Sequence, residues 1–131
     1  MNNKLDKILA EISAGELLDK ITILEIKKEK ISNKNNLEFI DKEYASLNQS
    51  LKKNVKISTE IKNLWIELKS INLKLWEIED EKRLAEKNKK FDEKFIELAR
   101  NVYKFNDERA KIKLTINDIL GSNIKEVKSY E

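Results

Sequence analysis

The sequence predicts an all-α fold, an antiparallel helical bundle or helical hairpin with three long helices and a short N-terminal helix. Charged residues make up 39% of the chain and apolar residues 40%, whereas about 25% charged residues is usual. This balance is typical of thin helical bundles with charged outer faces. The chain also holds two Gly and no Pro, too few for the tight turns that a β protein needs.

Length and charge limit the organisation further. With 131 residues, the chain can bury one hydrophobic core, and we expect a single helical domain over 1–131 with a short polar tail over 122–131. The 27 basic and 24 acidic residues are intermixed and give a net charge of +3. Such a surface lacks the basic patch of a nucleic-acid-binding protein, so no nucleic-acid partner is expected.

Missing residue types exclude several kinds of site. Without Cys or His, the chain cannot form a thiolate nucleophile, a Ser-His triad or a metal site with Cys or His ligands. We therefore expect no cofactor and no metal. No stretch approaches the roughly 18 consecutive apolar residues of a membrane span, and the charged N-terminal residues do not resemble a signal peptide. These observations predict a cytoplasmic protein without membrane insertion.

The first two helices are predicted from apolar spacing and from a cap. A short amphipathic helix is expected over 5–12, because apolar residues recur there at helical spacing. These residues are Leu5, Ile8, Leu9 and Ile12. The motif Ser-Ala-Gly-Glu at 13–16 predicts a capping box, which satisfies free N–H groups at a helix start. The helix that follows, from about Ala14 to Ser32, is apolar around most of its circumference, so we expect it to be central.

The remaining helices are expected to follow one another closely. A narrow apolar stripe predicts a peripheral helix over 35–55 with Asn35 as its cap. The phase of the stripe then changes, which indicates a break at 54–58 before a cap at Ser58 or Thr59, although whether 32–58 is one helix or broken stays open. A long helix reaches about Lys87, and after a turn the last helix runs over 91–121. Gly121 should end it, since Gly adopts the left-handed conformation at little cost.

Polar side chains interrupt the apolar sides of three predicted helices. On the last helix, Arg109 falls in the middle of the apolar side, with Asn106 and Lys113 at its edge. On the 59–87 helix, Glu79 lies close to the centre of that side. Further polar residues within or beside the apolar sides are Asn72 and Arg83 on the 59–87 helix, and Glu16, Lys20 and Glu25 on the central helix.

An antiparallel hairpin of the last two helices would bring some of these residues together. Asn72 would lie level with Asn106 and Arg109, whereas Glu79 would lie nearer Tyr103. A buried charge is costly unless it is paired and hydrogen-bonded. The polar side chains are therefore expected either to bind one another or to border a wet pocket.

Two interpretations follow. In the first, an interhelical salt-bridge network fixes the register of the helices, and the protein is a structural or protein-interaction module that binds another protein or self-associates as a homodimer. In the second, the protein binds a small anionic ligand, a phosphate- or carboxylate-bearing metabolite, or acts on it as a metal-free enzyme. The anion-holding residues would then be Arg83, Arg109 and Lys113, with Asn72, Glu79 and Asn106 orienting the ligand and Tyr103 beside it. The first interpretation is favoured.

A third interpretation is a magnesium-dependent hydrolase similar to helical nucleotide pyrophosphatases. Glu16-x-x-Asp19 and Glu77-x-x-Asp80 have the spacing with which two carboxylates on one helix face share a hard cation. The faces argue against such a site, because Glu77 points away from the apolar side and Asp19 is expected on the polar sector of its helix. Such spacings also arise by chance in a chain rich in Glu, so no metal ligand is predicted.

Four stretches of the sequence carry a family resemblance. They are GELLDKITILEIK at 15–27, LWEIED at 75–80, ARNVYKFNDERAKIK at 99–113 and EVKSY at 126–130. They resemble an uncharacterised family of small bacterial proteins that is classed as a domain of unknown function. The resemblance implies a free-standing helical bacterial protein, and it brings no established activity, substrate or catalytic residue.

Overall fold

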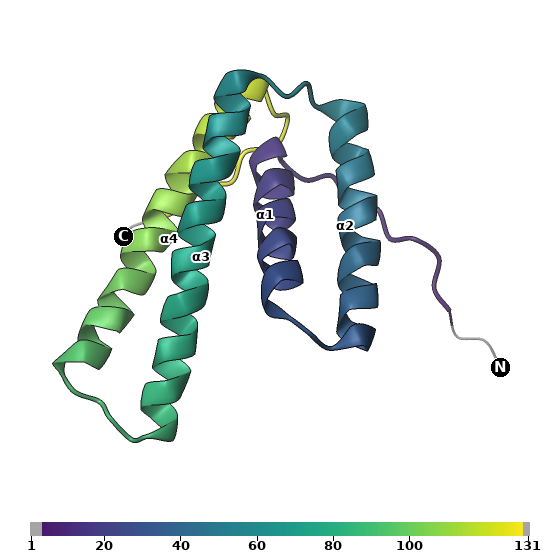
Figure 1. Cartoon of the computed structure of the whole chain (residues 1–131). Helices are drawn as coiled ribbons and strands as arrows, with labels where there is room; N and C mark the ends of the chain where they lie inside the picture. The colour runs from purple at the N-terminus through teal and green to yellow at the C-terminus, as the bar shows by residue number, and fades with distance from the viewer. Residues whose placement is uncertain (1–3, 130–131) are drawn as a thin grey trace.

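The computed structural model describes residues 4–129, and within that range it contains four α-helices and no strand. Figure 1 shows them in chain order as α1 (Ala14–Lys30), α2 (Lys34–Asn54), α3 (Thr59–Lys87) and α4 (Glu93–Leu120). The all-α prediction is confirmed, and the predicted break after α2 is present. Among the described residues, no helix combines the length and the apolar character needed to cross a membrane.

Each helix begins at a side-chain cap that accepts a hydrogen bond from the backbone N–H three residues further on. The caps are Ser13, Asn33, Ser58 and Asp92. The prediction of Ser13 is confirmed, and Ser58 rather than Thr59 is the cap of α3. The prediction of Asn35 is wrong, because Asn33 occupies the cap position and Asn35 lies inside α2. Gly121 ends α4 with a φ of 62°, the left-handed conformation expected of it.

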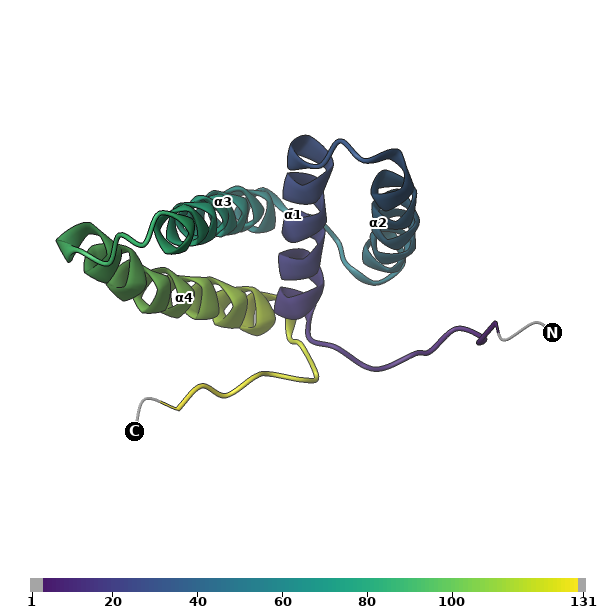
Figure 2. The ribbon, with the colours of Figure 1, turned by 90° about the horizontal axis from the view of Figure 1, so that it is seen from below.

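α1 is the central helix, as predicted. The helices α3 and α4 form a long antiparallel hairpin, and α1 packs against both of them and against α2, whose backbone approaches no other helix closely. Figure 2 shows that α1 crosses the long hairpin obliquely. Its first turn lies beside α4, where Gly15 bonds to Asn117, and its last turn lies beside α3, where Glu29 bonds to Lys69.

The hydrophobic core lies where α1 crosses the start of α3 and the end of α4. It is built from Leu17, Leu18, Ile21, Leu51, Ile61, Leu68 and Ile116. Full burial of a Leu or Ile side chain stabilises the fold by roughly 1.5–3 kcal/mol. Leu51 belongs to α2, so the core anchors both α1 and the end of α2 to one end of the long hairpin, which we call its base.

The long hairpin extends well beyond this base. Asn72 of α3 and Asn106 of α4 are the residues closest to the tip that take part in the polar network described below. We call residues 73–105, which project from the body in Figure 1, the distal hairpin. Four of its large apolar side chains are between 48% and 58% exposed: Leu84, Phe91, Ile96 and Tyr103.

The predicted helix over 5–12 is wrong. Residues 4–12 have no regular secondary structure, and the side chains of Leu5, Ile8 and Leu9 are between 78% and 87% exposed. A helix this short is marginal in water without tertiary packing. Because no neighbouring element covers these side chains, helical spacing alone does not produce a helix here.

Candidate functional site

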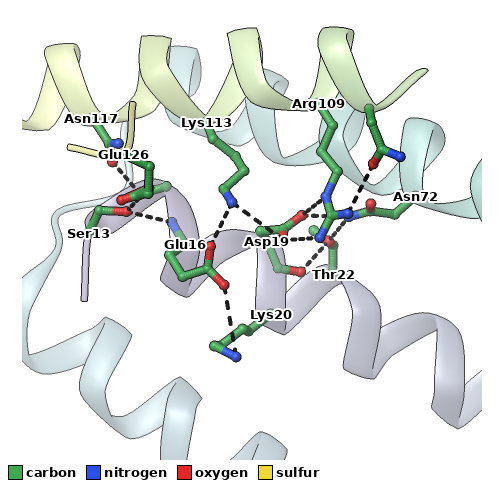
Figure 3. A network of polar contacts seen from close by, with 12 residues as sticks. Ser13, Glu16, Asp19, Lys20, Thr22, Asn72, Arg109, Lys113, Asn117 and Glu126 are labelled. Atoms are coloured by element: carbon green, nitrogen blue, oxygen red, sulfur yellow. Dashed lines mark hydrogen bonds and ion pairs between the residues drawn. The ribbon is translucent and has the colours of Figure 1, made fainter. Parts of the chain in front are cut away.

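A network of polar side chains joins α1 to α3 and α4 at the base of the long hairpin (Figure 3). It consists of a buried carboxylate held by Arg109, an ion pair made by Lys113, and a set of bonds that closes the start of α1. Across residues 4–129, every buried side-chain nitrogen or oxygen has a hydrogen-bond partner. We call this arrangement the polar network.

Asp19 of α1 is the centre of the polar network. Its side chain is 1% exposed, and its carboxylate accepts two hydrogen bonds from Arg109, from Nε to Oδ1 at 2.9 Å and from Nη2 to Oδ2 at 2.5 Å. Such bidentate pairs between Arg and a carboxylate are among the stronger polar interactions in proteins. The bond to Asp19 raises the pKa of Arg109 above its ordinary value, so the guanidinium stays protonated.

Two amides and a hydroxyl complete the surroundings of this pair. Asn72 of α3 donates to Oδ1 of Asp19 and to Oγ1 of Thr22, both at 2.9 Å. Thr22 donates to the backbone carbonyl of Asp19 at 2.8 Å. Asn106 accepts a hydrogen bond from Nη1 of Arg109 at 3.3 Å. A single carboxylate of α1 thus holds a side chain from α3 and another from α4.

Lys113 makes the second ion pair of the network. Its ammonium lies 2.6 Å from Oε2 of Glu16 and 4.0 Å from Oδ2 of Asp19. Lys20 approaches the other carboxylate oxygen of Glu16 at 3.8 Å from the solvent side. The side chain of Lys113 is only 18% exposed, so solvent screens its pair with Glu16 less than it screens a surface pair.

The free N–H groups at the start of α1 are hydrogen-bonded to side chains of the same protein. The first three N–H groups of α1 donate to Ser122 Oγ, Asn117 Oδ1 and Ser13 Oγ at 3.1, 2.6 and 3.0 Å. The hydroxyl of Ser13 donates to Glu126 at 2.6 Å. A Cβ atom on Gly15 would lie 2.5 Å from a backbone oxygen of α4, so the close approach of the two helices requires glycine. Helix starts often bind anions, but these donors are already occupied.

Six of the predicted site residues lie in the polar network, namely Glu16, Lys20, Asn72, Asn106, Arg109 and Lys113. Glu25 lies outside it, between α1 and α3, where it accepts a hydrogen bond from Nε1 of Trp65 at 2.9 Å. Tyr103 lies on the distal hairpin and is 58% exposed. The structure therefore brings most of the predicted residues together, whereas Glu25 and Tyr103 lie apart from the polar network.

Glu79 and Arg83 do not point into the protein, and this part of the prediction is wrong. Both residues are exposed, and Glu79 pairs with Lys82 of its own helix at 3.3 Å. Glu79 follows Asn72 by seven residues, so it lies on the side of α3 that meets α1. Its side chain is nevertheless 51% exposed, because α1 does not cover α3 at this level.

Asp19 is the central residue that sequence reasoning misses. The helical pattern places it on the polar sector of α1, and this placement is wrong, because that sector faces α3 and α4 rather than water. The apolar residues around most of α1 are the signal that could have identified it, since a helix covered on several sides has little solvent-facing surface. Thr22 of the same helix and Asn117 of α4 are buried as well, and the pattern does not single them out.

The network offers little capacity for metal chemistry. Both carboxylates of the Glu16-x-x-Asp19 pair accept hydrogen bonds from cationic side chains, which leaves neither open to a hard cation. Among the described residues, no group of three or more acidic side chains is placed to hold a metal ion. What the arrangement does provide is a set of bonds that orients three helices.

Comparison with known proteins yields a family without an assigned activity. A family model whose description is a family of unknown function matches residues 8–131. No curated protein and no solved structure matches the chain significantly. The matched range includes all four helices and every residue of the polar network.

Proposed function

The chain belongs to DUF6165, a family of unknown function, and from its geometry we propose that it is a helical structural and protein-interaction module rather than an enzyme. In this role the polar network holds α1 across the base of the long hairpin, and the distal hairpin contacts a protein partner. The observation that carries the proposal is the complete pairing of the buried polar atoms among the described residues.

The charged side chains of the polar network bind one another, which supports a structural role for them. Ligand sites usually present polar groups that converge on an open pocket, whereas Asp19, Arg109 and Asn72 bind one another. A buried ion pair adds little net stability, but the loss of one partner is costly. Such a pair therefore penalises any arrangement in which α1 is displaced along the hairpin.

The distal hairpin supports the interaction role. Two packed helices bury only the sides that face each other, and stable bundles usually contain more helices. Exposed apolar side chains that occur singly need no explanation. Here four large ones lie on one projecting hairpin: Leu84, Phe91, Ile96 and Tyr103. Aromatic residues of this kind are enriched in protein interfaces.

A photo-crosslinking amino acid at position 103 tests this proposal in cells of the source organism. We expect Tyr103, when replaced in this way, to form an adduct with a protein, because the side chain is exposed on the distal hairpin. The matched control is Lys52, an exposed residue of α2, which should form none. The absence of adducts from positions 84, 96 and 103 in a folded, expressed chain would contradict the proposal.

A second candidate function, the binding of a small anionic ligand, rests on one cavity. The cavity lies between α4 and the segment that follows it and has a volume of about 590 Å³. Its lining combines the apolar residues Ala110, Leu114 and Val127 with Lys111, Lys113, Lys125, Lys128 and one carboxylate, Glu126. Cationic groups around an apolar floor favour an anion with an apolar part. Lys113, Lys125 and Lys128, however, already pair with acidic side chains.

A thermal-shift series tests this second candidate. Inorganic phosphate, a dicarboxylate and decanoate are added in turn, and a ligand that binds only the folded chain raises its Tm. The increase should disappear in Lys111→Glu, which reverses a charge at the cavity, and persist in the control Lys52→Glu on α2. If none of the three anions raises the Tm of the native chain, the cavity does not bind this class of ligand.

A further inference from the structure

The side of the long hairpin that meets α1 continues onto the distal hairpin. Trp76 and Glu79 follow Asn72 by four and seven residues, and Val102 precedes Arg109 by seven, so all three lie on that side. Within the part of the chain that the structure describes, the side-chain bonds between α1 and the hairpin reach no further toward the tip than Asn72 and Arg109. Beyond that level this side of the hairpin is open.

The open side combines apolar residues with two exposed charges. Trp76 of α3 and Phe95 and Val102 of α4 are only half-buried, although large apolar side chains of a packed bundle are usually covered. Glu79 and Arg83 are exposed beside them. We call these five residues the open face.

We propose that the open face binds the open face of a second copy of this chain, so that two distal hairpins form an intermolecular four-helix bundle. This inference rests on the proposed function and deepens it by naming the partner. Most protein dimers are symmetric about a two-fold axis, and their interfaces are self-complementary. The open face meets that requirement through its charges.

The two charges are opposite in sign and one helical turn apart. When two copies of α3 run antiparallel across a two-fold axis that passes between Glu79 and Arg83, Glu79 of each copy faces Arg83 of the other. The same contact then forms twice, and complementary charges of this kind set the register of an interface. A partner surface whose charges all have one sign would be attracted by one of these two residues and repelled by the other.

The charge of the whole distal hairpin is also compatible with self-association. Residues 73–105 contain nine basic and eight acidic side chains, so two copies meet without strong net repulsion. The net charge of this stretch is only +1 (nine minus eight), which offers little attraction to a polyanion. A second copy therefore fits the open face better than a nucleic acid does.

Charge reversal tests the proposed register. Glu79→Arg places Arg opposite Arg at both contacts, and Arg83→Glu places Glu opposite Glu, so each variant should dimerise at least tenfold more weakly than the native chain. An equal mixture of the two variants restores both contacts and should form a heterodimer with a near-native Kd. Sedimentation equilibrium measures the dissociation constants, and Lys52→Glu on α2 is the control that should dimerise normally. Far-UV circular dichroism verifies folding, which reversal of two exposed side chains should preserve.

Three results would overturn the inference. A native chain that stays monomeric at about 100 µM, a concentration at which even weak specific dimers form, has no such interface. A dimer that neither reversal weakens uses another face. A mixture that binds no tighter than the single variants has a different register. If an adduct at position 103 contains another protein while the chain stays monomeric, the proposed interaction role survives and only the identity of the partner is wrong.

Discussion

Asp19 shows how a single side chain positions three helices. Its carboxylate binds Arg109 of α4 and Asn72 of α3, while its own backbone lies in α1. The desolvation of such a pair offsets most of its Coulomb attraction. Its main contribution is therefore to the relative placement of the helices, because any displaced arrangement would leave a buried charge without its partner.

The loss of one member of this pair should cost more than the loss of both. Asp19→Leu removes the carboxylate that accepts hydrogen bonds from both Arg109 and Asn72, leaves the guanidinium without its counter-charge, and should lower the free energy of unfolding by about 3–5 kcal/mol. The double variant Asp19→Leu with Arg109→Met should lower it by clearly less than the sum of the two single changes. Urea denaturation of the native chain and the three variants measures the difference. Additive costs would show that the pair is not coupled.

Gly15 should not tolerate a methyl group. Gly→Ala within a helix ordinarily stabilises by about 0.5–1 kcal/mol. Here the new Cβ would lie 2.5 Å from the backbone oxygen of Lys113 and 2.9 Å from Oδ1 of Asn117, and we expect Gly15→Ala to destabilise the fold by about 1–3 kcal/mol. Thermal denaturation tests the sign. Gly121→Asn is the control, because Asn tolerates positive φ and no atom lies within 4 Å of that Cβ.

At the scale of elements, α1 is attached to the long hairpin at both of its ends. Its start is bound to α4 and to the segment that follows it through Gly15 and Ser13. Its end is bound to α3 through the pair of Glu29 and Lys69, whose side-chain atoms lie 2.8 Å apart. The core and the polar network lie between these two attachments, so α1 cannot tilt without breaking one of them.

Two serine caps provide a matched comparison of these attachments. Ser58 accepts one backbone hydrogen bond at the start of α3, whereas Ser13 accepts one and also donates to Glu126. Ser58→Ala should therefore cost about 1 kcal/mol, and Ser13→Ala should cost about 1 kcal/mol more, since a bond to a charged acceptor is lost as well. Chemical denaturation measures both. Equal costs would mean that the bond to Glu126 contributes nothing.

The pair at the other end of α1 should depend on pH. Lys69 lowers the pKa of Glu29 below its ordinary value of 4.5. A carboxyl group whose pKa is lowered on folding stabilises the folded state above its unfolded pKa, and this contribution disappears as pH falls through the folded pKa. The difference in free energy of unfolding between the native chain and Glu29→Gln should thus be present at neutral pH and vanish in acid. A difference that is independent of pH would exclude this pair as its source.

At the scale of the whole molecule, packing is unevenly distributed. The core and the polar network both lie at the base of the long hairpin, while the distal hairpin and the N-terminal segment project from it. This division places the stability of the fold at one end and leaves apolar surface available for contacts at the other.

The N-terminal segment should be dispensable for folding. Leu5, Ile8 and Leu9 are largely exposed, and the cap of α1 at Ser13 lies after them. A chain that lacks residues 1–12 should unfold with a free energy within about 0.5 kcal/mol of the native value, as measured by thermal and chemical denaturation. A larger loss would show that the segment packs on the body more firmly than its exposure indicates.

The sequence by itself determines the four helices between Ala14 and Leu120, the cap at Ser13, the end of α4 at Gly121 and the central place of α1, although the same periodicity wrongly predicts a helix over 5–12. These features depend on apolar periodicity and on bonds between neighbours along the chain. The sequence also identifies Asn72, Arg109 and Lys113, because a polar residue on an apolar side requires a partner.

Only the tertiary structure decides which partners these residues find. The oblique crossing of α1 places Asp19 between α3 and α4, although its own helical pattern assigns it to the polar sector. Glu79 shares a side of α3 with Asn72 and is nevertheless exposed, because α1 does not cover that level. Periodicity determines the direction in which a side chain points, whereas its burial depends on how far the neighbouring helix extends.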